Sequence, residues 1–137
     1  MRVGVTENIE IVRGFYSAGP AADDAARHPF ASPHIVWHVP GANRVSGEYR
    51  GAHDVFTMMP AAMQPLDRWE IEVVDVMGNA DLVVATVLVR GERYGRKIDS
   101  PGAHVFRLED GRIAEAWGFV ADQVTLDEML DALPGPA

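Results

Sequence analysis

The sequence LVVATVLVR, residues 82–90, decides the fold, because it is rich in β-branched residues and follows the two-residue period of a strand. The neighbouring segments 69–76, 97–108 and 112–120 have the same period. Typical antiparallel turn residues separate the four segments, at Gly78-Asn79, Gly91 to Gly95 and Asp110-Gly111. The pattern predicts four long antiparallel strands, which must twist and curl.

Two helices are expected ahead of the strands. Thr6 is expected to cap the first, which ends at Gly19-Pro20. Its apolar positions Ile9, Val12 and Tyr16 share one face. The alanine-rich segment 21–30 predicts a second, shorter helix that Pro29 and Pro33 bring to an end.

The middle of the chain predicts one short strand and one helix. Residues 35–39 are β-branched and aromatic, with Val36 and His38 on one face and Trp37 on the other. Residues 55–63 have a helical pattern with a kink or a new turn at Pro60, and they offer a methionine-rich wall.

The C-terminal end predicts a last helix, because Thr125 to Glu128 has the spacing of a capping box ahead of an apolar face. The chain then frays from Pro134 onward. No linker or repeat divides residues 1–137, so we expect a single α+β domain with helices packed on one side of a curved sheet.

Composition excludes several classes of function. The chain of 137 residues has a formal charge of −8, which disfavours nucleic acid and anionic membranes as partners. It has no apolar run of membrane-spanning length and no secretory signal, so a cytoplasmic location is expected. It lacks cysteine, phosphate-loop and dinucleotide fingerprints, and His34 and His38 are too far apart along a strand to share one metal ion. We expect neither cofactor nor metal.

Several motifs together carry a family resemblance. They are Phe15-Tyr16, Val36-Trp37-His38-Val39-Pro40-Gly41, the Gly47-x-Tyr49-x-Gly51 segment, His104-Val105-Phe106-Arg107, and Asp110 to Trp117. In this order they resemble the SnoaL-like branch of the nuclear-transport-factor-2-like superfamily, over nearly the whole chain. The resemblance implies a cone-shaped curved antiparallel sheet, a cystatin-like α+β roll, with helices closing an apolar cavity. Members of the superfamily include ketosteroid isomerases, polyketide cyclases and dehydratases.

The resemblance also implies positions for catalytic groups. His38 stands where the isomerases carry their general-base aspartate, and His104 where they carry their oxyanion-side aspartate. The oxyanion tyrosine falls at or beside Phe15, so a role for Tyr16 depends on the register of the first helix. The positions of the epoxide-hydrolase triad hold Val87, Ala85 and Gly118, which excludes that reaction.

Strand alternation predicts the wall of the cavity. The expected wall residues are Phe15, Val36, Phe56, Met59, Met63, Val83, Ala85, Val87, Gly102, Phe106, Ala116, Gly118 and Val120. His38 and His104 are the polar groups expected to converge on a ligand, although each fits a structural role equally well. Asp122 either lies at the cavity rim or caps the last helix.

These expectations lead to two hypotheses of different classes. In the first, the protein is a cofactor-free isomerase, cyclase or dehydratase, in which His38 removes a proton beside a carbonyl and His104 hydrogen-bonds the oxyanion, assisted by Tyr16 and Asp122. In the second, it is a non-catalytic module that holds a small apolar metabolite. A homodimer is expected in both, because Trp69 or Trp117 on the convex face would otherwise leave an exposed apolar patch.

Overall fold

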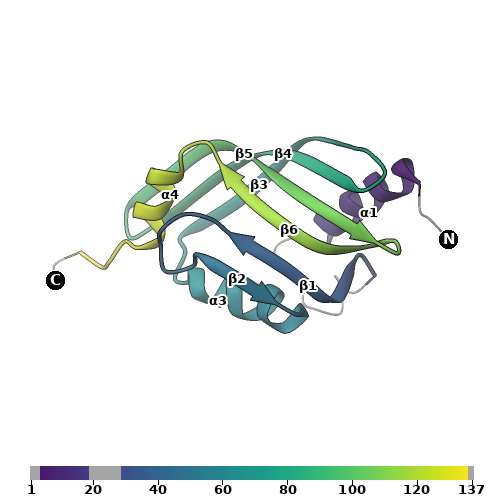
Figure 1. Cartoon of the computed structure of the whole chain (residues 1–137). Helices are drawn as coiled ribbons and strands as arrows, with labels where there is room; N and C mark the ends of the chain where they lie inside the picture. Colours follow the sequence, from purple (N-terminus) through teal and green to yellow (C-terminus); the bar gives the residue numbers. More distant parts are fainter. Residues whose placement is uncertain (1–3, 19–28, 136–137) are drawn as a thin grey trace.

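The computed structural model describes residues 4–18 and 29–135 and contains one open, six-stranded curved sheet (Figure 1). The strand order is β2-β1-β6-β5-β4-β3. The strands are β1 (Ala31–Val39), β2 (Gly47–Arg50), β3 (Arg68–Gly78), β4 (Leu82–Arg93), β5 (Arg96–Glu109) and β6 (Arg112–Val120). The four long strands of the sequence prediction are therefore confirmed as β3 to β6.

Tight turns join the long strands. Tyr94 and Gly95 have φ values of 47° and 80°, and Asp110 and Gly111 have values of 51° and 77°. Two consecutive residues with positive φ make the two-residue turn whose twist matches that of the flanking strands. The expected turn over residues 91–95 is in fact confined to Tyr94-Gly95, because β4 continues through Arg93.

The short strands complete the sheet in a way that local patterns do not predict. Val36 to Val39 pair antiparallel with β2, and the other edge of β1 pairs parallel with β6. The parallel pairing brings His38 opposite Trp117 and Trp37 opposite Ala116. Among the described strands, a single parallel pair in an otherwise antiparallel sheet therefore decides which strands lie beside the family motif at residues 36–41.

The first helix, α1 (Val5–Ser17), packs its apolar face against one end of the concave side of the sheet (Figure 1). It begins after Gly4 and has no side-chain cap, so the prediction that Thr6 caps it is wrong; Thr6 lies inside the first turn. The predicted helix over 21–30 lies outside the described residues, except for its last two positions, which form a turn.

The other helices lie toward the opposite end (Figure 1). A π-helical turn, η1 (Asp54–Met58), leads directly into α3 (Met59–Met63), with Pro60 in the first turn of α3. The last helix is α4 (Gln123–Leu130). Its N-cap is Asp122, so the predicted capping box at Thr125 is wrong, and Thr125 instead donates its N–H to the Asp122 side chain.

Arg93 joins the segments at this second end. Its side chain is buried and donates to the backbone carbonyls of Met63, Pro65 and Ala132, at 3.1, 3.3 and 3.2 Å. These carbonyls belong to the end of α3, the loop after it and the residues after α4. A buried guanidinium needs hydrogen-bond acceptors, and here one cation holds three segments together.

In the described part of the chain, two apolar clusters fill the interior. The larger cluster includes Val12 and Phe15 of α1 with Val83 and Phe106 of the sheet. The smaller cluster forms around Leu126, Met129 and Leu130 of α4, together with Val45 and Ile98. The space where these clusters meet is not filled by side chains, and it forms the cavity described next.

Candidate ligand-binding site

A cavity of about 390 Å³ lies between the two apolar clusters. This volume is in the lower part of the range of roughly 300–1,000 Å³ that ligand pockets span. Its lining residues include Phe15, Tyr16, Trp37, Val39, Val45, Phe56, Met59, Met63, Trp69, Ile71, Val89, His104, Gly118, Val120, Leu126 and Leu130. Most of the wall is aliphatic or aromatic, so the cavity suits a small, largely apolar molecule.

A buried pair of polar side chains stands at one end of the cavity. Tyr16 comes from the last turns of α1 and His104 from the middle of β5, and the phenol hydroxyl is hydrogen-bonded to His104 Nδ1. The two rings are stacked with their centroids 5.8 Å apart. Phe106 packs edge-on against both rings, and so holds the pair in place.

Burial keeps both groups neutral. Desolvation lowers the pKa of His104 to about 4, because the charged imidazolium is disfavoured in apolar surroundings. The same effect raises the pKa of Tyr16 far above its ordinary value. Near neutral pH the site therefore contains a neutral imidazole and a protonated phenol.

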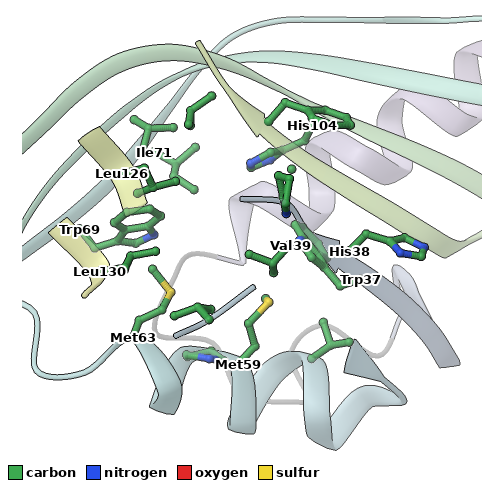
Figure 2. A pocket seen from close by; sticks show the side chains of 18 of the residues that line it. Trp37, His38, Val39, Met59, Met63, Trp69, Ile71, His104, Leu126 and Leu130 are labelled. Carbon is green, nitrogen blue, oxygen red and sulfur yellow. The ribbon is translucent and has the colours of Figure 1, made fainter. Parts of the chain in front are cut away.

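The hydrogen bond also assigns the tautomer of His104. The hydroxyl proton of Tyr16 has no other acceptor among the described residues, so it is donated to Nδ1. The ring proton of the neutral imidazole is then on Nε2. Figure 2 shows the His104 imidazole directed into the cavity, where this N–H has no partner within the described part of the chain.

His38 does not converge with His104. Although His38 borders the cavity, Figure 2 shows its imidazole pointing away from the side chains around His104. On the convex face its Nε2 lies 2.6 Å from Glu115 Oε2, and its ring stacks on Trp117 at 5.1 Å. The hydrogen bond with His38 is the largest influence that lowers the pKa of Glu115. The expected convergence of the two histidines is therefore wrong.

Strand alternation explains why Trp37 enters the cavity in place of His38. Successive side chains of β1 point to opposite faces, and the convex face receives His38. Trp37 packs on Phe15 with ring centroids 6.2 Å apart and edge-on against His104 at 5.8 Å. The sequence prediction placed these two residues on opposite faces, but it assigned the inward face to Val36 and His38, and that assignment is wrong, since Trp37 is the residue that packs against His104.

Asp122 takes the structural role that the sequence left open. Its carboxylate accepts from the Thr125 N–H at 3.2 Å and caps α4, and its own N–H donates to Ser100 Oγ at 3.0 Å. It is not among the residues that line the cavity. The expected assistance of Asp122 at the cavity rim is not supported by this geometry.

The predicted wall is only partly the observed one. Phe15, Phe56, Met59, Met63, Gly118 and Val120 line the cavity. The predicted residues that do not line it are Val36, Val83, Ala85, Val87, Gly102, Phe106 and Ala116. Most of these belong to the larger core cluster, because α1 covers that end of the concave face and fills it with its own side chains.

The opposite end of the wall was missed in the sequence. Trp69, Ile71 and Val89 of β3 and β4 line it, as do Leu126 and Leu130 of α4. The strand pattern contained a signal for this end, because Trp69, Ile71 and Val89 have the alternation of inward-facing positions. Trp69 therefore does not lie on the convex face, where it was considered; of the two candidate tryptophans, Trp117 is the one beside His38.

The site has a restricted chemistry. Among the described lining residues there is no Asp, Glu, Lys or Arg. In residues 4–18 and 29–135 no group of three His, Asp or Glu side chains is placed to hold a metal ion. The helices in the same ranges are all too short or too polar to span a membrane. The polar groups available to a ligand are chiefly the ring N–H groups of Trp37 and His104 and the side-chain amides of Gln64 and Gln123.

Comparison with known proteins agrees with the fold. A model of the SnoaL-like domain matches residues 12–116, so the chain belongs to this family, and the expected fold class is confirmed. An uncharacterised protein of Mycobacterium tuberculosis is 26% identical over 117 residues, which cover 84% of this chain and 89% of the relative.

Two crystal structures are similar to the whole arrangement. A protein of unknown function with a cystatin-like fold from Xanthomonas campestris has a TM-score of 0.82 and 30% identity, covering 91% of this chain and 98% of that one. A protein from Jannaschia sp. CCS1, described as a candidate SnoaL-like polyketide cyclase, has a TM-score of 0.75 and 22% identity, with 95% of each chain covered.

Proposed function

We propose that the protein binds a small, largely apolar carbonyl compound and acts on it as a cofactor-free catalyst of the isomerase, cyclase or dehydratase type. The observation that carries this proposal is the neutral Tyr16–His104 pair, which presents an N–H to an apolar cavity. The candidate polyketide cyclase among the similar structures has the same fold and is consistent with this class of reaction.

His104 acts as a hydrogen-bond donor to the carbonyl oxygen. When a proton leaves the carbon beside a carbonyl, negative charge develops on the oxygen, and a donor already in place stabilises that charge. Tyr16 donates to the other ring nitrogen and thereby polarises the imidazole, which strengthens the Nε2–H as a donor. The leaving proton passes to water or to a basic group of the substrate, since no carboxylate is among the described lining residues.

The same observations favour a second candidate function, non-catalytic ligand binding. A pKa of about 4 makes His104 a weak base at neutral pH, and an efficient general base has a pKa near the working pH. A protein that only holds a carbonyl compound needs the donor and the apolar wall and no base. The two candidates differ in whether bound ketone exchanges its α-hydrogens.

Deuterium exchange tests the two candidates directly. 2-Tetralone in D2O is incubated with the protein, and incorporation of deuterium beside the carbonyl is followed by proton NMR. Faster exchange than in buffer, lost in His104→Gln and retained in His38→Gln, supports the catalytic proposal. Binding without accelerated exchange supports the ligand-binding function, and neither binding nor exchange overturns both.

A homodimer through the convex face is also proposed. Val84, Val105 and Trp117 lie in register across three adjacent strands on that face, and Phe119 beside them is 47% exposed. Contiguous apolar surface of this kind is costly to leave in water. Light scattering is expected to give twice the chain mass at micromolar concentration, and a monomer mass would contradict the proposal.

A further inference from the structure

We infer that Trp37 supplies a second N–H donor, so that Trp37 and His104 together hold one neutral carbonyl oxygen in a one-atom space beside Gly118. The inference rests on the proposed function, because it specifies the ligand class of the same cavity. It assigns a binding role to a tryptophan that neither the family resemblance nor the strand pattern indicated.

Gly118 lies where the two donors meet. A Cβ built on Gly118 would lie 3.7 Å from His104 Nε2 and 3.7 Å from Trp37 Nε1. A ligand oxygen close to that point is within reach of hydrogen bonds of about 3 Å from both nitrogens. Gly118 itself lines the cavity, so this space is continuous with the rest of it.

Both nitrogens are available to a ligand. His104 uses Nδ1 for Tyr16, and neither its Nε2 nor Trp37 Nε1 has a hydrogen-bond partner within the described part of the chain. Both nitrogens also have accessible surface, because neither of them is among the fully buried polar atoms that have no hydrogen-bond partner. Polar groups that border an apolar cavity without a partner favour a ligand that pairs with them.

The chemistry of the two groups selects the ligand. The indole and the Nε2–H imidazole are both donors at these atoms, so they accept no hydrogen bond from a hydroxyl or an amine. A carboxylate or a phosphate would enter without a Lys or Arg among the described lining residues, and an unpaired charge is costly to bury. A neutral ketone, whose oxygen accepts hydrogen bonds and carries no charge, meets both conditions.

The wall indicates the body of the ligand. Opposite the donors lie the flexible side chains of Met59 and Met63 and the flat ring of Trp69 (Figure 2). Methionine and aromatic surfaces pack well on rings. The ligand class is therefore a cyclic or aryl ketone with one carbonyl at its narrow end and a hydrocarbon body.

The experiment compares 1-tetralone with tetralin, which has the same ring system without the oxygen. Affinities are measured by calorimetry, and the stretching frequency of 13C-labelled carbonyl is measured by isotope-edited infrared spectroscopy. Trp37→Phe removes one N–H and keeps a ring, and Trp69→Phe is the matched control, because it removes an indole N–H from the other end of the cavity. Thermal melting of each variant verifies folding.

The wild type is expected to prefer the ketone to the hydrocarbon and to lower the carbonyl frequency. Trp37→Phe is expected to weaken 1-tetralone binding about fivefold, as for the loss of one neutral hydrogen bond, and to raise the carbonyl frequency while tetralin binding stays unchanged. Trp69→Phe is expected to leave the frequency unchanged.

The outcomes separate the inference from the function on which it rests. If the wild type binds the ketone no better than tetralin, or binds neither, the proposed carbonyl-binding function fails. If the preference and the lowered frequency are present but survive in Trp37→Phe, the assignment of Trp37 is overturned and the proposed function stands.

Discussion

Replacing Gly118 with alanine is expected to separate ligand binding from stability. The added methyl group would make ordinary contacts with His104 and Trp37, the nearest at 3.5 Å, so the fold accommodates it. The same methyl group occupies the point at which the carbonyl oxygen is expected to lie. The ketone then loses two hydrogen bonds of about 1 kcal/mol each, which corresponds to roughly thirtyfold weaker binding.

Stability is expected to change in the opposite direction. Gly118 has no positive φ that would make a side chain unfavourable, and replacing such a glycine with alanine stabilises by about 0.4–1 kcal/mol through the unfolded chain. The assays are calorimetric titration with 1-tetralone and tetralin, and thermal melting of both proteins. Unchanged ketone affinity in Gly118→Ala, with the fold intact, would refute the placement of the carbonyl.

Three further predictions concern other parts of the molecule. Folding lowers the pKa of His104 from about 6.5 to about 4, so between these pH values the unfolded chain binds a proton on His104 and the folded protein does not. The free energy of unfolding is therefore expected to fall by about 3 kcal/mol as pH decreases from 6.5 to 4. Urea denaturation of the wild type and of His104→Gln across this pH range measures the effect. If the free energy of unfolding falls as steeply with pH in His104→Gln as in the wild type, His104 is not the origin of the pH dependence. Arg93→Met leaves three carbonyls without their donor and is expected to cost about 2–3 kcal/mol; an unchanged urea midpoint would show that the contacts are dispensable. His38→Gln is expected to leave the affinity for 1-tetralone unchanged, because the imidazole lies on the convex face with Glu115. A tenfold loss of affinity would show that His38 contributes to the binding site.

The framework of the fold could be predicted from sequence because it depends on local signals. Alternation over 82–90 and the positive-φ turn at Asp110-Gly111 are properties of a few adjacent residues, and both are present in the structure. The starts of α1 at Val5 and of α4 at Gln123 differ by only a few positions from the starts predicted with caps at Thr6 and Thr125, and Asp122 caps α4 as one of the two alternatives stated for it. Cap choices of this kind depend on tertiary contacts such as the bond from Asp122 N–H to Ser100.

The site was less predictable because it depends on which strands pair and on which side chains fill the concave face. The opposite orientation of Trp37 and His38 follows from alternation, but the parallel pairing of β1 with β6 decides which of them meets the cavity. Similarly, Val83 and Phe106 were placed on the concave face, and the depth to which α1 enters that face makes them core residues. Pairing partners and helix depth are long-range quantities that no local pattern contains.

A crystal structure of the protein with 1-tetralone tests the central claim most directly. The account predicts the ring system between the methionines of α3 and Trp69, with the carbonyl oxygen about 3 Å from His104 Nε2 and from Trp37 Nε1. A bound ketone whose oxygen faces away from both nitrogens, or an empty cavity at saturating ketone, would contradict it.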